Sequence, residues 1–270
     1  MAIPDPIVAF ERMELVLDGR QFLDGINMAV YPGERFLVFG PYGCGKSLFP
    51  RIILGLIRAT AGRVLVLGRD VATLHRRELY DMRMGLGFVP RENHLIHNLS
   101  VFENIALPLA YHRRSTTTLL QNRVRSVIDF FNLGEYAALR PHQLQNLTAK
   151  KVALAQALVC RPRILLIDGP YAGMDVLVAQ KLNRLYFEDT VRWWRENPLG
   201  DSDAAEERLA IFLSCSVLHR ILDCVDRCAM LYDRRFVFTG TRDELKTTDN
   251  PYVRQFLDAR GEGPIQYAGI

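Results

Sequence analysis

The segment Gly40–Ser47 has the pattern G-x-x-x-x-G-K-S, and it limits the fold of this chain more than any other feature. An apolar stretch, 35–39, precedes it, and a helical pattern follows it. Such a loop wraps its backbone N–H groups around phosphates, while Lys46 reaches the outer phosphates and the Ser47 hydroxyl binds Mg²⁺. Because the loop must join a strand to a helix, the sequence predicts an α/β fold with a phosphate site.

A second apolar stretch ends in a carboxylate that suits the same site. Residues 163–168 form a predicted buried strand whose last residue, Asp168, we expect on the Mg²⁺ side. The next residue is Gly169, which can neither orient nor deprotonate an attacking water. The chain is therefore predicted to hold a nucleotide and to cleave it poorly. The predicted nucleotide-binding residues are Gly40, Gly43, Cys44, Gly45, Lys46, Ser47, Leu48 and Asp168, with Ser47 and Asp168 as the metal ligands.

Composition favours a globular, intracellular protein. The 270 residues are 49% hydrophobic and 24% charged, which is ordinary for a soluble domain with a large core. No apolar run approaches the ~18 residues that span a membrane, and no secretory signal is predicted. The net charge of +4 is weak reason to expect nucleic acid, so none is predicted as a partner. The five cysteines form no C-x-x-C pair, which is typical of reduced cytosolic thiols.

The hydrophobic pattern predicts two additions to the core. Residues 7–29 read as strands broken by a turn at Asp18-Gly19, which predicts an N-terminal antiparallel β subdomain. From Val101 to Val159 apolar residues recur with helical spacing. We therefore expect an α-helical subdomain, at about 91–160, inserted between two strands of the core.

The second half of the chain completes the predicted core. Residues 209–214 have the continuous apolar character of a buried parallel strand, Val176–Trp194 read as one helix, and 197–207 as a polar loop. We predict one domain over residues 1–249. The extension 250–270 reads as a short amphipathic helix followed by an extended arm, since glycines and a proline cannot continue the helix.

This order of elements resembles the ATP-binding subunits of ABC transporters. The segments Arg140–Leu144 and Val152–Leu158 are similar to the flanks of that family's signature, and Pro170–Asp175 is similar to its D-loop. The resemblance implies a P-loop NTPase core of the ABC ATPase kind, with ATP and Mg²⁺ as cofactors. It also implies a transmembrane permease and a second ATPase subunit as partners.

A finer resemblance points to the ATPases of Mla/MCE-type phospholipid transporters. Val101–Leu109, Asn250–Asp258 and Gly263–Ile265 are close to segments of that group. This implies a lipid transport complex with an MCE-domain lipid-binding protein, and a peripheral position on the cytoplasmic face of the inner membrane. It further implies that the C-terminal arm packs on the neighbouring ATPase subunit.

The chain departs from the family at positions that carry catalysis. By resemblance, the position of the catalytic glutamate holds Gly169, that of the switch histidine holds Cys215 after Ser214, and that of the Q-loop glutamine holds Arg91. The glycine-containing signature is replaced by Leu144–Thr148, or by 147–151 when shifted by three residues. The adenine-stacking aromatic is replaced by Leu15–Leu17.

These departures predict impaired hydrolysis. A thiol at position 215 cannot carry the positive charge of a histidine, and side chains in the signature obstruct a close approach of backbone to phosphate. Thr148 remains a possible helix cap, and Arg91 either neutralises phosphate charge or forms a surface salt bridge. Three functions stay open: an ATP-binding subunit with impaired hydrolysis, an active ATPase with substitute residues, and a scaffold without nucleotide.

Overall fold

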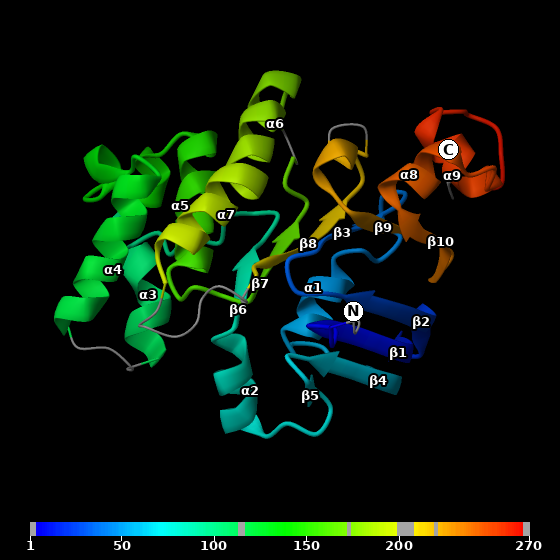
Figure 1. Ribbon diagram of the computed structural model, residues 1–270, viewed down its shortest axis with the longest axis horizontal. Coiled ribbons are helices and arrows are strands. Elements are labelled where there is room, and N and C mark those ends of the chain that lie inside the picture. The colour runs from blue at the N-terminus through cyan, green and yellow to red at the C-terminus, as the bar shows by residue number, and fades with distance from the viewer. Residues whose placement is uncertain (1–3, 113–116, 172–173, 199–207, 219–220, 267–270) are drawn as a thin grey trace.

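A six-stranded sheet forms the centre of the molecule, and a four-stranded antiparallel sheet lies beside it (Figure 1). The computed structural model describes residues 4–112, 117–171, 174–198, 208–218 and 221–266. The strands are β1 (Val8–Leu17), β2 (Arg20–Val30), β3 (Arg35–Phe39), β4 (Ala61–Val66), β5 (Arg69–Asp70), β6 (Leu86–Val89), β7 (Ile164–Asp168), β8 (Ala210–Cys215), β9 (Arg227–Tyr232) and β10 (Arg235–Thr241).

The central sheet is buried on both faces. Its order is β10-β9-β3-β8-β7-β6, and all neighbours are parallel except β10, which pairs antiparallel with β9 at the edge. Along β3, Leu37 and Phe39 belong to one hydrophobic cluster, whereas Phe36 and Val38 belong to another on the opposite face. Continuous apolar strands are what a sheet covered on both sides requires, and the predicted α/β class is confirmed.

The antiparallel sheet has the order β2-β1-β4-β5. The turn between β1 and β2 is formed by Asp18 and Gly19, both with positive φ, 49° and 74°. Two successive positive φ values are typical of a type I′ turn, whose twist matches that of a hairpin. Phe10 of this sheet stacks on Phe49, with ring centroids 5.7 Å apart, so the two sheets share one core. The predicted N-terminal β subdomain is confirmed.

The helical insertion lies at one end of the central sheet, where Figure 1 shows α3, α4 and α5 in green. Ile105, Val124 and Val152, one from each of these helices, are fully buried in one cluster. The α-helices are α1 (Leu48–Ile53), α2 (Arg76–Arg83), α3 (Val101–His112), α4 (Thr117–Phe130), α5 (Asn146–Leu158), α6 (Val176–Asn183), α7 (Thr190–Glu196), α8 (Arg242–Thr247) and α9 (Pro251–Leu257). Short 3-10 turns are η1 (Gly134–Tyr136), η2 (Pro141–Gln143) and η4 (Leu222–Cys224).

The single helix predicted over Val176–Trp194 is interrupted. A π-helical segment, η3 (Arg184–Asp189), separates α6 from α7. The backbone N–H and the side-chain hydroxyl of Thr190 both donate to the carbonyl of Leu185, five residues earlier, and the hydroxyl bond is 2.8 Å long. Thr190 is fully buried, and the bond to Leu185 within the π turn satisfies its hydroxyl.

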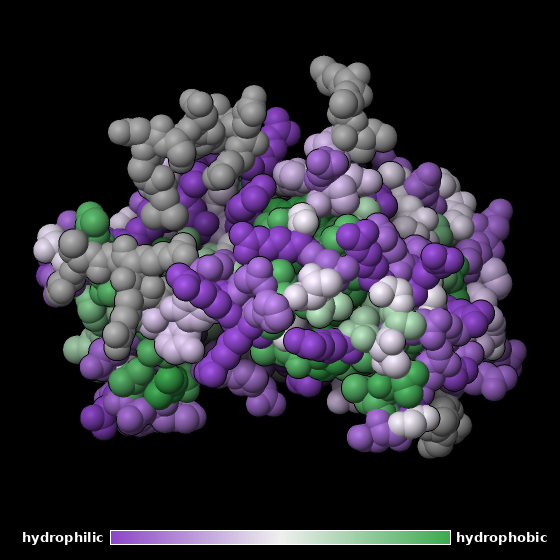
Figure 2. Space-filling model, turned by 90° about the horizontal axis from the view of Figure 1, so that it is seen from below, coloured by the Kyte–Doolittle hydropathy of each residue, from purple (hydrophilic) through white to green (hydrophobic). Residues whose placement is uncertain are grey.

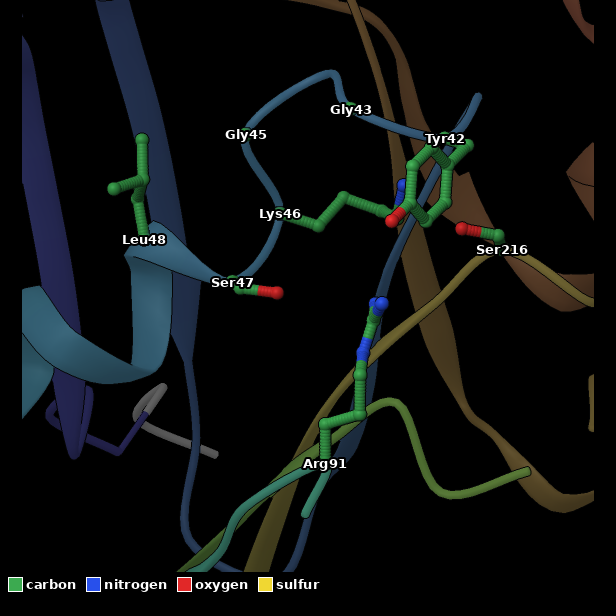
Figure 3. Close-up of a pocket in the computed structure, with 8 residues that line it drawn as sticks. All are labelled: Tyr42, Gly43, Gly45, Lys46, Ser47, Leu48, Arg91 and Ser216. Carbon is green, nitrogen blue, oxygen red and sulfur yellow. The ribbon is translucent and has the colours of Figure 1, made fainter. Parts of the chain in front are cut away.

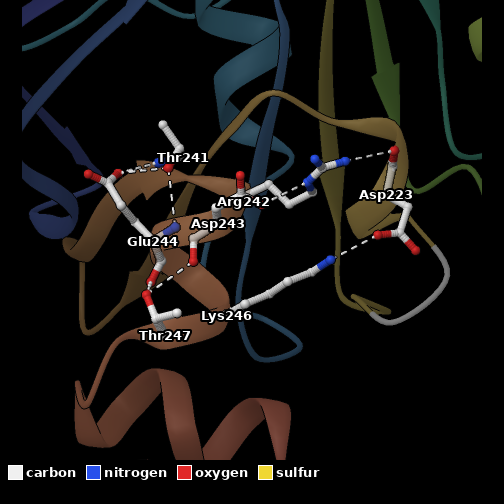
Figure 4. Close-up of polar contacts among 7 residues, drawn as sticks. All are labelled: Asp223, Thr241, Arg242, Asp243, Glu244, Lys246 and Thr247. Carbon is white, nitrogen blue, oxygen red and sulfur yellow. Dashed lines mark hydrogen bonds and ion pairs between the residues drawn. The ribbon is translucent and has the colours of Figure 1, made fainter.

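Helix α8 is tied to the connection between β8 and β9 (Figure 4). Thr241 caps the helix by accepting from the Glu244 N–H, and the Glu244 carboxylate accepts from the Thr241 N–H in return. This capping box satisfies two backbone donors that a helix start otherwise leaves free. Lys246 and Arg242 donate to the side chain and the backbone carbonyl of Asp223, at 3.0 and 3.4 Å.

The C-terminal segment folds back onto the core. Gln255 of α9 holds the backbone of Ile265 with two hydrogen bonds, donating from Nε2 at 3.1 Å and accepting at Oε1 at 2.6 Å. Val253 and Ile265 are buried in the large cluster, and the Phe256 ring contacts Phe39 at 5.8 Å. The predicted short helix is confirmed, and residues 258–266 do not continue it. Residues 264–266 bond Gln255 and Tyr232 of the same chain, and packing of the tail on a second subunit stays a prediction.

Some predicted features fall outside the described residues. These are 172–173 of the D-loop-like segment, most of the polar loop (199–207) and the end of the chain (267–270). Within the described residues, no helix is long and apolar enough to cross a bilayer. Figure 2 shows one face of the molecule, on which hydrophobic patches are interspersed among hydrophilic side chains.

Candidate functional site

The phosphate loop lies at the carboxyl edge of the central sheet. It follows β3, whose neighbour β8 ends in Cys215, and β8 in turn pairs with β7, which ends in Asp168. Gly40 has φ 150°, and a Cβ there would lie 2.2 Å from the carbonyl oxygen of Leu231. Only glycine fits that close approach. The loop therefore folds as the motif predicted, next to the strand ends that complete the site.

Lys46 points into its own loop. Its Nζ donates to the carbonyls of Gly40 and Pro41, at 2.9 and 2.6 Å, and the side chain is only 5% exposed. The Cys44 sulfur lies 3.4 Å from the same nitrogen. Burial lowers the pKa of Lys46, although the nearby Cys44 acts in the opposite direction. The ammonium is thus held by carbonyl dipoles and can exchange them for phosphate oxygens.

Ser47 and Asp168, the two predicted metal ligands, lie together. The Ser47 hydroxyl donates to Asp168 Oδ1 at 3.0 Å, and the Ser214 hydroxyl donates to the same oxygen. Mg²⁺ usually takes one or two protein oxygens and completes its shell with phosphates and water. A hydroxyl and a carboxylate beside a phosphate loop fit that ion. Within the described residues, no group of three His, Cys, Asp or Glu side chains suggests another metal.

The cavity over the loop measures about 250 Å³. Figure 3 shows that the Lys46 side chain enters it from the loop and the Arg91 side chain enters it from the opposite side. Tyr42 and Ser216 also line the cavity, and sequence reasoning gave neither of them a role. The lining residues are Tyr42, Gly43, Gly45, Lys46, Ser47, Leu48, Arg91 and Ser216.

Gly169 and Arg91 fit together although 78 positions separate them in the sequence. Gly169 has φ 55°, and its N–H donates to the Ser214 carbonyl at 2.8 Å. A Cβ at Gly169 would lie 2.7 Å from Arg91 Nε. The space beside Asp168 that a side chain at position 169 would enter is therefore filled by the arginine. Of the two alternatives for Arg91, the surface salt bridge is not observed, since no ion pair of Arg91 is found within the described residues.

Cys215 is an inward-facing thiol. It is 4% exposed, and its sulfur accepts from the Val217 N–H at 3.3 Å. Burial raises its pKa, so the thiol stays neutral at physiological pH. The group exposed to the cavity at this strand end is Ser216. His219, considered as a replacement for the missing histidine, lies outside the described residues.

The signature-like segment straddles the start of α5. Gln145 is the N-cap residue and Asn146 is the first helical residue, so Leu144–Thr148 places a helix N-terminus where the resemblance requires one. The shifted register, 147–151, lies within the helix. Thr148 does not cap α5, contrary to expectation, because the helix begins two residues before it.

The aromatic side chain beside the loop comes from an unexpected position. Leu15 is fully buried, which agrees with the absence of a stacking ring at Leu15–Leu17. A second cavity, of about 320 Å³, adjoins Gly43 and Cys44 and is lined by Phe22 from the start of β2. Phe22 carries the Arg20 guanidinium 5.5 Å from its ring centre. This placement depends on how the start of β2 packs beside the loop and residues 233–234.

Comparison with known proteins agrees with this geometry. A family model described as ABC transporter matches residues 23–172. The intermembrane phospholipid transport system ATP-binding protein MlaF of Escherichia coli (strain K12) is 27% identical over 252 residues, which cover 92% of this chain and 87% of MlaF. The probable ribonucleotide transport ATP-binding protein mkl of Mycobacterium leprae (strain TN) is 28% identical over 243 residues, covering 90% of this chain and 66% of mkl. The chain thus spans about two thirds of the mycobacterial protein's length.

Solved structures share the fold. The structure of cbiO1 from Clostridium perfringens, part of the ABC transporter complex cbiONQ, has a TM-score of 0.77 at 22% identity and covers 95% of this chain and 96% of that one. The dimeric ATP-binding cassette MJ0796, bound to ADP and Pi, has a TM-score of 0.72 at 23% identity, covering 87% of this chain and 98% of that one. Because the family model spans more than half of the sequence, this chain belongs to the ABC transporter family and is an ABC-type ATP-binding domain.

Proposed function

We propose that this chain is the ATP-binding subunit of an ABC-type phospholipid transport complex of the Mla/MCE kind, and that it binds Mg·ATP with strongly impaired hydrolysis. The observation that carries the proposal is the contact between Ser47 and Asp168 at the end of an intact phosphate loop. Members of the family bind ATP, normally with Mg²⁺. Bound Mg²⁺ would neutralise phosphate charge, and Ser47 and Asp168 are the residues that would hold it.

Binding requires Lys46 to change partners. Its ammonium now bonds two carbonyls of its own loop, and phosphate oxygens would replace them with charge-assisted bonds. Phe22 is placed beside the loop to pack against the base, in place of the aromatic missing from Leu15–Leu17. These two residues would anchor opposite ends of the nucleotide.

Impaired hydrolysis follows from the groups beside Asp168. A positioned general base contributes roughly 10²–10⁴-fold to a rate, and position 169 offers none. Cys215 is buried and neutral, and Arg91 is a permanent cation that cannot accept a proton from water. Among the described residues that line the cavity there is no carboxylate or imidazole to serve as a substitute base, which speaks against the active-ATPase alternative; His219 lies outside those residues.

The transport role is supported by the MlaF likeness, which extends over 92% of the chain. ABC-type ATP-binding subunits act with a transmembrane permease and as dimers. We therefore propose a permease, a second ATPase subunit and an MCE-domain protein as partners, on the cytoplasmic face of the inner membrane. A phospholipid is the proposed cargo.

Calorimetry tests nucleotide binding. Mg·ATP should bind the wild type, and Lys46→Ala should lose most of the affinity, since it removes a charged contact to phosphate. Lys181→Ala, an exposed lysine on α6, is the matched control and should bind as the wild type does. Equal binding by the wild type and Lys46→Ala would refute the site. Phosphate release by the same proteins, alone and with the permease, then distinguishes an impaired from an active ATPase.

A further inference from the structure

The candidate site carries more positive than negative charge. Lys46 and Arg91 line the cavity, Lys150 bonds the backbone of Arg91, and Asp168 is the carboxylate that acts on Lys150. Lys150 is 3% exposed, and burial together with Arg91 lowers its pKa. Three buried or half-buried cations beside one carboxylate favour an anionic ligand.

Arg91 is the cation with unused hydrogen-bonding capacity. Its Nε is buried and has no hydrogen-bond partner in the part of the chain that the structure describes. The guanidinium extends past Gly169 toward the loop, where it lies 5.9 Å from the centre of the Tyr42 ring (Figure 3). Tyr42 is itself 80% exposed, so the ring and the guanidinium form the outer wall of the cavity. A buried donor without an acceptor is costly unless a ligand supplies one.

The backbone of Arg91 is held by a hydrogen bond from α5. Lys150 of α5 donates from Nζ to the Arg91 carbonyl at 2.7 Å. The missing side chain at Gly169 leaves room for the Arg91 side chain to cross the end of β7. The backbone of Arg91 is therefore fixed, while its head group remains free to meet a ligand.

We propose that Arg91 binds the terminal phosphate of a nucleoside triphosphate and makes the site retain triphosphates over diphosphates. The proposal rests on the function proposed above, because it requires the phosphates to lie along the loop, with Lys46 at the outer ones. Arg91 approaches the cavity from the side opposite the loop, so the phosphate farthest from the nucleoside is the one it reaches. A guanidinium matches a phosphate with two parallel hydrogen bonds. A diphosphate offers no group at that position.

The positive charge of Arg91 determines which chemistry it can perform beside Gly169. A carboxylate at position 169 would accept a proton from water, whereas the Arg91 guanidinium is already protonated and can only donate hydrogen bonds. The same space is thus used to hold the terminal phosphate and not to remove it. Gly169 and Arg91 therefore depend on each other, since the Arg91 side chain occupies the volume that a side chain at position 169 would fill.

Nucleotide titration tests this role. Calorimetry is performed with Mg²⁺ and a non-hydrolysable imidotriphosphate of adenosine, and separately with ADP, on the wild type, Arg91→Gln, Arg91→Lys and the exposed control Arg58→Gln. Arg91→Gln should weaken triphosphate binding about 10-fold or more, the effect of losing a charged hydrogen bond, and weaken ADP binding less than about threefold. Arg91→Lys should fall between, and Arg58→Gln should match the wild type.

The outcomes separate the two proposals. If the wild type binds neither nucleotide, the proposed function fails and this role fails with it. If the wild type binds both nucleotides and Arg91→Gln leaves the ratio of triphosphate to ADP affinity unchanged, only the role of Arg91 is overturned. Melting curves of each variant without nucleotide confirm that it is folded, and Arg91→Lys keeps the test valid if Arg91→Gln does not fold.

Discussion

Replacing Gly169 by alanine measures how tightly Gly169 and Arg91 fit. A non-glycine residue in the left-handed region costs about 1–2 kcal/mol, and φ at Gly169 is 55°. The new Cβ would also lie 2.7 Å from Arg91 Nε, so the arginine must shift. That shift breaks no hydrogen bond of Nε, which has none, and we assign it ~1 kcal/mol, as for mild overpacking. The sum is about 2–3 kcal/mol, or a fall in melting temperature of about 4–6 °C at roughly 2 °C per kcal/mol.

Three control variants separate the contributions. Gly261→Ala has normal φ and no neighbour within 4 Å, so its melting temperature should change little. Gly19→Ala has φ 74° and no neighbour within 4 Å, so it reports the backbone strain alone. Gly169→Ala in an Arg91→Ala background should lose the contribution from the arginine. The measurement is differential scanning calorimetry without nucleotide, because a ligand would add its own stabilisation. If Gly169→Ala melts like Gly261→Ala, or if the Arg91 background makes no difference, the interlocked fit is wrong.

Three further changes test other parts of the structure. Gly169→Glu alone should leave phosphate release at background, since its side chain enters a filled space and Cys215 remains; a turnover above about 1 s⁻¹ would contradict this. We propose that the permease docks on a groove built partly from Arg91–Leu99 and the helical insertion. Ile96→Asp should then release the permease without lowering the melting temperature, because Ile96 is 40% exposed, whereas Leu95 is buried and its charge substitution should unfold the domain; a retained complex counts against docking at Ile96. Burial raises the pKa of Cys228 to about 12 in the folded protein, so the thiol ionises at lower pH when the protein is unfolded. The neutral thiol therefore contributes to the stability of the folded state fully below about pH 8.5, and this contribution is lost as the pH rises toward 12. Melting temperatures between pH 8 and 10.5 should fall less steeply for Cys228→Ala than for the wild type, and parallel curves would show that this thiol is not responsible.

The phosphate loop and Asp168 were predictable from sequence because each is positioned by the end of its own strand. Gly40–Ser47 needs only a preceding strand and a following helix, and Asp168 needs only a parallel neighbour that ends at the same sheet edge. The partners of Gly169 depend instead on the long-range packing of Arg91, and no spacing rule predicts which side chain fills a missing one. Phe22 escaped prediction for the same reason, since long-range packing of β2 beside the loop and residues 233–234 places it there.

The interruption of the helix over Val176–Trp194 shows another limit. Its apolar residues have ordinary helical spacing, and no residue pattern marks the π turn in which Thr190 bonds the Leu185 carbonyl. The end of the C-terminal segment depends on long-range contacts as well. Its glycines suggested an extended chain, whereas Gln255 holds the backbone of Ile265 with both ends of its amide.

The folded-back C-terminal segment also bears on the order in which the molecule is assembled during synthesis. Phe256 packs against Phe39, the last residue of the strand that leads into the phosphate loop. A ribosome delivers Phe39 more than 200 residues before Phe256 and Ile265, and until then one side of that strand end lacks its cover. The end of this strand therefore reaches its final packing only when Phe256 has emerged. A nascent chain stalled before that point should be open to proteolysis near Phe39, and completion of the chain should remove that sensitivity.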